Sequence, residues 1–174
     1  MKRLSNRMIL LTALSLATSL PAVFVHAQPA PDVIAAMNEA PIHNAARMGT
    51  RSDVEQLLKT SAQSRDTRTP LGATPLHHAA MNGDSGPTRA LLAAGANPNA
   101  RDVDGRTALH MAAFSTRKDN AMLLLRAGAD PLLKTNDGRD VLSMARKVRA
   151  DELAGEVSLW ILKGCKIDKP VKDC

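Results

Sequence analysis

Histidine is the residue type of this 174-residue chain whose spacing bears most directly on chemistry, because imidazole binds metal ions and transfers protons. His43, His77 and His110 recur at nearly equal intervals, each much longer than a helical turn. Such intervals place them on successive structural units rather than at positions i and i+4 of one helix, the geometry of a helical metal pair. We therefore predict no metal site from these three residues.

Motifs for catalysis are missing as well. The sequence contains no G-x-S-x-G elbow, no G-x-x-x-x-G-K-[ST] phosphate loop and no H-E-x-x-H helix. Residues 102–105 resemble the start of a calcium loop, but Met111 stands where such a loop needs a glutamate. We predict that the protein is not an enzyme and needs no cofactor. A small-molecule or haem carrier that uses His78 and Met81 is an alternative.

Four blocks of similar sequence show how the chain is organised. They are residues 40–46 (APIHNAA), 74–80 (TPLHHAA), 107–113 (TALHMAA) and the degenerate block 140–146 (DVLSMAR). The second and third are followed by Leu-Leu and then by Gly-Ala-Asn or Gly-Ala-Asp. Repetition with a period of about 33 residues is typical of a solenoid whose units bury their apolar faces against one another.

These blocks closely resemble the ankyrin repeat. The resemblance implies an all-α solenoid of about four helix-turn-helix units with short hairpin fingers, at 39–72, 73–105, 106–138 and 139–163. Thr74 and Thr107 would cap the first helices of their units. The resemblance also gives His43, His77 and His110 a scaffold role, in which each hydrogen-bonds the backbone of an adjoining turn.

Composition agrees with this architecture. Aromatic residues make up 2% of the chain, which disfavours β-sandwiches and an aromatic-lined nucleic-acid platform. Paired alanines in the blocks allow neighbouring helices to approach closely. We expect no nucleic acid as a partner.

Residues 1–27 are typical of a secretory signal peptide. A basic start precedes an apolar run over residues 8–20, and Val25 and Ala27 are small residues at the positions that a signal peptidase reads. We predict cleavage after Ala27 and a periplasmic or secreted protein from a Gram-negative bacterium, with no membrane contact afterwards. An uncleaved anchor is the alternative, although the run is shorter than the ~20 residues of a span. Removal of this segment lowers the net charge from +6 to +3.

Both ends of the repeat domain carry predicted caps. Residues 28–38 are expected to form an N-terminal cap, and Trp160 in the last helix is expected to close the other end. Residues 164–174 form a tail in which Cys165 and Cys174 would pair, as two neighbouring cysteines of an exported chain usually do. A redox-active pair is the alternative, but the C-x-x-C spacing is absent.

The resemblance implies that another protein binds the concave face, through the finger tips and the two residues after Ala-Ala in each first helix. Phe114 with Met48, Met81, Leu71 and Val103 would form an apolar stripe flanked by cations, so we expect a partner with an acidic patch. Alternatively, Phe114 lies between helices and the arginines are merely solvated. The implied contact residues are Arg47, Met48, Leu71, Ala73, Met81, Asn82, Val103, Asp104, Arg106, Phe114, Ser115, Asn136, Asp137, Arg139, Arg146 and Lys147.

These expectations point to a monomeric adaptor or protective factor for a periplasmic protein, such as one in peroxide defence. An immunity protein that neutralises a toxin delivered to the periplasm would leave the same features in the sequence.

Overall fold

The structure is a computed structural model that describes residues 40–165. The predicted signal peptide, the predicted N-terminal cap at 28–38 and residues 166–174 lie outside the described residues. The predicted Cys165–Cys174 disulfide therefore stays a prediction. Cys165 itself is buried and lies just beyond the last helix.

Residues 40–165 form eight α-helices and one short 3-10 helix. No residue in this range belongs to a β-strand. The predicted all-α class is confirmed. The helices are α2 (Pro41–Met48), α3 (Arg51–Thr60), η1 (Ala62–Asp66), α4 (Pro75–Ala79), α5 (Gly86–Ala93), α6 (Ala108–Phe114), α7 (Lys118–Arg126), α8 (Val141–Lys147) and α9 (Asp151–Leu162).

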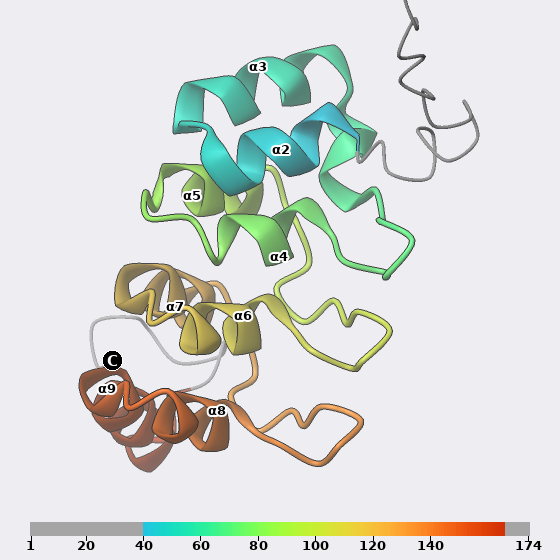
Figure 1. Cartoon of the computed structure of the whole chain (residues 1–174). Coiled ribbons are helices and arrows are strands. Elements are labelled where there is room, and N and C mark those ends of the chain that lie inside the picture. The colour runs from blue at the N-terminus through green and yellow to red at the C-terminus, as the bar shows by residue number, and fades with distance from the viewer. Residues whose placement is uncertain (1–39, 166–174) are drawn as a thin grey trace, which may run out of the picture.

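The helices lie in two layers (Figure 1). The inner layer consists of α2, α4, α6 and α8, each packed on the next, and α3, α5 and α7 are stacked in the same way in the outer layer. Helix α9 packs on α8 and completes the last pair. Hairpin fingers precede α4, α6 and α8 and project to one side of the stack.

Small residues set the spacing of the inner layer. The alanines that close the first three blocks, Ala46, Ala80 and Ala113, are fully buried, as are Leu76 and Leu109. An alanine takes up so little room that the backbones of adjacent helices can lie close together, while Ile42 in α2, a leucine in α4 and in α6, and Val141 in α8 fill the remaining space. The core is thus a continuous column of small and branched aliphatic side chains.

Helix ends follow from the local sequence. In α4, Thr74 and His77 form a reciprocal cap, and Pro75 occupies the first turn, where its missing N–H costs nothing. Asp140 caps α8 by accepting a hydrogen bond from Ser143 N at 2.8 Å. Thr116 ends α6 with a φ of +56°, a left-handed conformation that glycine adopts more easily.

Two asparagines join neighbouring repeats at the carboxyl ends of the inner helices. Asn82 Nδ2 donates to the carbonyls of Ala46 (3.1 Å) and Gly49 (3.0 Å) in the preceding repeat. Asn120 Nδ2 lies within 3.2 Å of the carbonyl oxygens of Ala79, Ala80 and Asn82. The last carbonyls of a helix have no partner within it, so these amides satisfy groups that burial would otherwise leave unpaired.

The last helix pair closes the stack. Trp160 is buried with Leu153 and Val157, so it serves as part of the core and not as an exposed contact. Lys118 of α7 reaches α9, where its Nζ lies 2.5 Å from Glu152 and 3.7 Å from Glu156.

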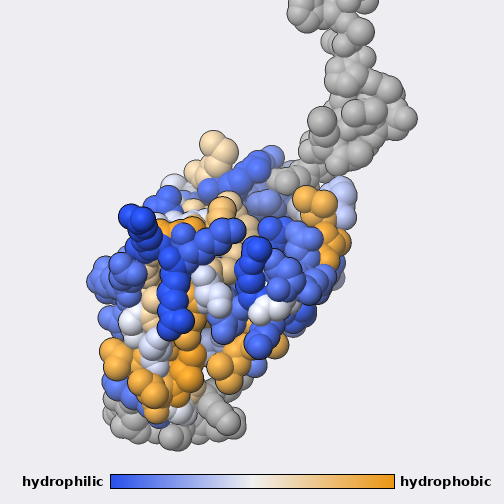
Figure 2. Space-filling model, turned by 60° about the horizontal axis from the view of Figure 1, so that its bottom comes forward, coloured by the Kyte–Doolittle hydropathy of each residue, from blue (hydrophilic) through white to orange (hydrophobic). Residues whose placement is uncertain are grey.

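Figure 2 shows the molecular surface with the α8–α9 end turned forward. On this surface, separate apolar patches lie between hydrophilic ones. The large apolar side chains that are exposed in the described residues are Met48, Leu71, Val103, Phe114, Leu132, Leu159 and Leu162.

Replacing Asn120 by alanine should reduce the free energy of unfolding by about 1–3 kcal/mol, because buried carbonyls of two neighbouring segments lose their donor. Urea unfolding followed by circular dichroism measures this loss. Asp119→Ala, at the exposed neighbouring position, is the control and should change the free energy by less than about 0.5 kcal/mol. Equal losses for the two variants would contradict the assigned role of Asn120.

Candidate protein-binding surface

Three fingers line one side of the inner layer, and each is closed by a backbone hydrogen bond of 2.9 Å. The bonds join Thr69 N to Ala73 O, Asp102 N to Arg106 O, and Thr135 N to Arg139 O. Adjacent fingers are also bonded to each other. Val103 N donates to Leu71 O at 3.0 Å, and Asn136 N donates to Asp104 O at 2.9 Å.

Arginines at the base of the fingers extend this connection. Arg68 Nη1 donates to the carbonyls of Gly72 and Arg101, both at 2.8 Å, and so links two fingers. One repeat later, Arg101 Nη2 donates to Lys134 O at 2.8 Å. The fingers are therefore held as one rigid row and not as independent loops.

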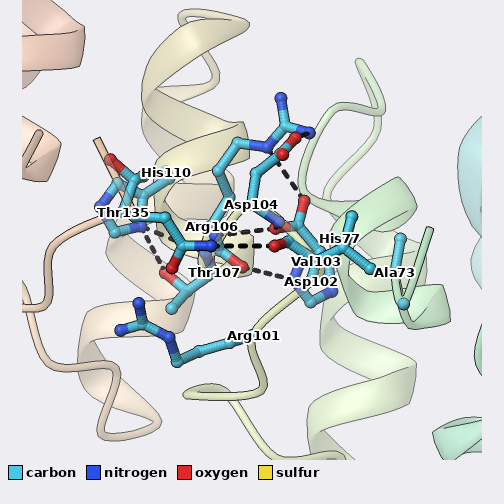
Figure 3. Close-up of polar contacts among 12 residues, drawn as sticks. Ala73, His77, Arg101, Asp102, Val103, Asp104, Arg106, Thr107, His110 and Thr135 are labelled. Carbon is cyan, nitrogen blue, oxygen red and sulfur yellow. Dashed lines mark hydrogen bonds and ion pairs between the residues drawn. The ribbon is translucent and has the colours of Figure 1, made fainter. Parts of the chain in front are cut away.

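The central finger, residues 102–106, is held by several polar contacts of its own side chains (Figure 3). Asp102, whose side chain is 5% exposed, accepts hydrogen bonds from the backbone N–H groups of Asp104 (2.9 Å) and Arg106 (2.8 Å). It also pairs with Arg106 Nε at 2.9 Å, and Arg106 Nη2 pairs with Asp104. Gly105 has a φ of +74°, and a side chain there would collide with Asn136 of the next finger. These contacts fix the direction of the Arg106 guanidinium.

His77 links this finger to α4 (Figure 3). Its Nδ1 accepts a hydrogen bond from the backbone N–H of Thr74 at 3.1 Å, so its Nε2 carries the proton and donates to Arg106 O at 3.0 Å. His43 Nε2 lies 3.1 Å from Thr67 O in the same way. His110 Nδ1 is bonded to Thr107, as His77 is to Thr74. All three histidines are buried, but the expected hydrogen bond from Nε2 to the backbone of an adjoining turn is found for His43 and His77 only, since His110 Nε2 has no such partner within residues 40–165.

Burial lowers the pKa of His77 and of His110 below the ordinary histidine value. The backbone carbonyls that face them oppose this change but are the smaller effect. Both side chains are consequently neutral at physiological pH, as a ring that accepts an amide hydrogen bond requires.

The expected contact residues differ in exposure. Met48 is 82% exposed, Leu71 65%, Val103 56% and Phe114 53%, so Phe114 does not lie hidden between helices. Half-buried positions are Ala73, Met81, Arg106 and Ser115, and exposed charged or polar positions are Arg47, Asp104, Asn136, Asp137, Arg139, Arg146 and Lys147.

Asn82 departs from the expectation. Its side chain is buried, and both amide hydrogen bonds run to the preceding repeat. Its position, two residues after Ala-Ala, is a contact position in the resemblance, but here the amide is needed at the end of α2. We therefore assign Asn82 to the scaffold and not to the binding surface.

A cleft of about 150 Å³ lies between α6, α8 and the two fingers next to them. Sequence reasoning identified four of its lining residues, Phe114, Arg106, Arg139 and Lys147, but missed Met111 and Met144. These two methionines occupy the same place in their blocks, directly after His110 and Ser143. Their shared place in the repeat is the signal that would have found them.

The alternative of a small-molecule or haem carrier depends on His78 and Met81, which are both half-buried within residues 40–165. No three His, Cys, Asp or Glu side chains gather there in a group that would hold a metal ion. The ring of His78 packs edge-on against His43, with centroids 5.5 Å apart, so it takes part in the packing between helices.

A family model that describes ankyrin repeats in three copies matches residues 34–135. The chain belongs to the ankyrin-repeat family. Such a domain is typically a non-catalytic module for binding proteins.

The helix pair α8–α9 lies beyond the matched residues, and α8 packs on α6 of the ankyrin repeats. No curated protein matches the chain at a significant level. Within residues 40–165, the ankyrin domain has no helix long and apolar enough to cross a bilayer.

The ankyrin domain should become less stable below about pH 6.5, the ordinary histidine pKa. The unfolded chain takes up protons at His77 and His110 near that pH, whereas in the folded chain the pKa values are lower. Stability is thus fully present above pH 6.5 and is lost as the pH falls below it.

Urea unfolding at pH 7.5 and pH 5.5 measures the change. Replacing both histidines by asparagine should flatten the difference between the two pH values, even if the variant is less stable at each. A double variant with the same pH dependence as the original chain would show that other groups cause it.

Proposed function

We propose that this chain is an exported ankyrin-repeat module that binds a periplasmic protein through its finger face. The finger face is the surface formed by the three fingers and the solvent-facing sides of α2, α4, α6 and α8. The observation that carries the proposal is the exposure of Met48, Leu71, Val103 and Phe114, which lie on these fingers and helices. Each of these residues is more than half exposed, and exposed apolar patches on a protein surface commonly mark sites of protein binding.

Three of the exposed apolar residues, Leu71, Val103 and Phe114, lie on or beside neighbouring fingers. Val103 and Leu71 lie at the tips of adjacent, hydrogen-bonded fingers. Phe114 lines the same cleft as Arg106 and Arg139, which belong to the central and last fingers. A central apolar region with a polar rim is the usual arrangement of a protein–protein contact.

The charges of the finger face indicate an acidic partner. The finger face also carries exposed cations, namely Arg47, Arg139, Arg146 and Lys147. Attraction between these groups and carboxylates would mainly speed association and select the partner. A nucleic acid fits less well, because the chain without residues 1–27 has a net charge of only +3 and almost no aromatic residues.

Export would place this module among proteins of the periplasm. Residues 1–27 have the basic start, apolar run and small residues of a signal peptide. A binding module there would act as an adaptor or protective factor for a resident enzyme, such as one in peroxide defence.

The proposal is tested with the chain purified from the periplasm, where its intact mass should correspond to residues 28–174. Proteins retained by this chain from periplasmic extract are identified, and their affinity for variants is measured. Val103→Ala and Phe114→Ala should each weaken binding at least about fivefold, which corresponds to about 1 kcal/mol.

Arg89→Glu in the outer layer is the control, because Arg89 is an exposed residue of α5. This variant should leave the affinity unchanged. An equal or larger loss of affinity for Arg89→Glu, or recovery of the chain with residues 1–27 still attached in the membrane, would contradict the proposal.

A further inference from the structure

The cleft between α6 and α8, called here the α6–α8 cleft, combines two kinds of lining. Phe114, Met111 and Met144 form its apolar part, and Arg106, Arg139 and Lys147 form its cationic part. Two of the cations come from fingers and one from the last turn of α8. The cleft is therefore where the finger row meets the inner helices.

No carboxylate of residues 40–165 lines this cleft. Two exposed acidic residues of the fingers, Asp104 and Asp137, line a separate hollow between the finger tips, together with Thr135 and Asn136. Arg106 lines both hollows. The cleft is thus lined by cationic groups, while Asp104 and Asp137, which pair with Arg106 and Arg139, line the neighbouring hollow.

The cations of the cleft differ in how they are held. Arg106 is fixed through Nε and Nη2 by two aspartates of its own finger, and Arg139 Nη1 lies 3.0 Å from Asp137. Lys147 forms no ion pair with any residue of the described range. A ligand carboxylate would therefore find a free ammonium group beside guanidinium groups that are already oriented, which reduces the entropy lost on binding.

Size and side-chain type limit what enters the apolar part. A volume of about 150 Å³ is well below the roughly 300–1,000 Å³ of typical small-molecule sites, but it suits one large side chain. Methionine is flexible and polarisable, so Met111 and Met144 can adapt to a leucine, a methionine or an aromatic ring. Phe114 at the rim remains 53% exposed and offers a face for stacking.

A second cleft, in the outer layer, is also lined by three cations, but carboxylates lie among them. It has a volume of about 380 Å³ and is lined by Arg89, Lys118 and Arg126, but also by Asp119 and Glu156. Its lysine already pairs with Glu152 and Glu156. Acidic groups of the protein itself thus occupy this site, which makes it a suitable control.

We propose that the α6–α8 cleft binds an acidic peptide segment of the partner, with one large apolar side chain inserted between Phe114 and the two methionines. Carboxylates next to that side chain pair with Lys147 and Arg139. This inference rests on the proposed function and specifies the partner's chemistry at one place on the finger face.

Selection of heptapeptides from a random phage-displayed library, on the exported chain as purified, tests the inference. The enriched peptides should contain one Leu, Met, Phe or Trp flanked by Asp or Glu. Anisotropy of a fluorescent copy of the best peptide should show at least a tenfold loss of affinity for Lys147→Glu and for Met144→Gln. Arg89→Glu should bind it as the original chain does, and urea unfolding verifies that all variants are folded.

Three results would overturn the inference. Peptides whose binding is lost in Val103→Asp but kept in Met144→Gln bind the finger tips, which leaves the proposed function intact. Peptides whose binding is lost in Arg89→Glu bind the outer layer, and this result would remove the support for both proposals. Failure to enrich peptides, or enrichment of sequences without Asp or Glu, shows that the cleft does not take an acidic segment.

Discussion

The hydrogen bond from His77 Nε2 to the carbonyl of Arg106 joins the first helix of one repeat to the finger that leads into the next. Because a single repeat buries its apolar face only against its neighbours, the array depends on such links for a defined geometry. The fixed tautomer of His77 makes the link directional, since one ring nitrogen is taken up by the cap at Thr74. Asn82 and Asn120 provide the corresponding links at the opposite ends of the inner helices.

These hydrogen bonds between repeats also hold the exposed surface of the fingers in a defined geometry. With Arg68 and Arg101 bonded across successive fingers, the finger tips do not move independently. Apolar side chains on such a frame lose little conformational freedom when a partner binds, and the arginines are already oriented by their aspartates. The same row of fingers thus carries both the hydrogen bonds that stabilise the fold and the exposed side chains of the candidate binding surface.

Much of this arrangement could be predicted from the sequence. The repeated blocks predicted the helices, and the threonines before them predicted the caps, because these features depend on a few residues that are close in the chain. Asn82 could not be predicted correctly. Its place after Ala-Ala predicted an exposed contact, and only the structure shows that its amide faces the unsatisfied carbonyls at the end of α2. The α6–α8 cleft depends in turn on the distance between helices from two repeats, which sequence spacing does not give.

Hydrogen–deuterium exchange on the exported chain, alone and with the protein it retains from periplasmic extract, tests the central claim most directly. If the finger face is the binding surface, the partner should slow exchange in residues 102–106 and 135–139 and in the inner helices α6 and α8. Slowed exchange confined to the outer helices α5 and α7, with the fingers unchanged, would contradict the account.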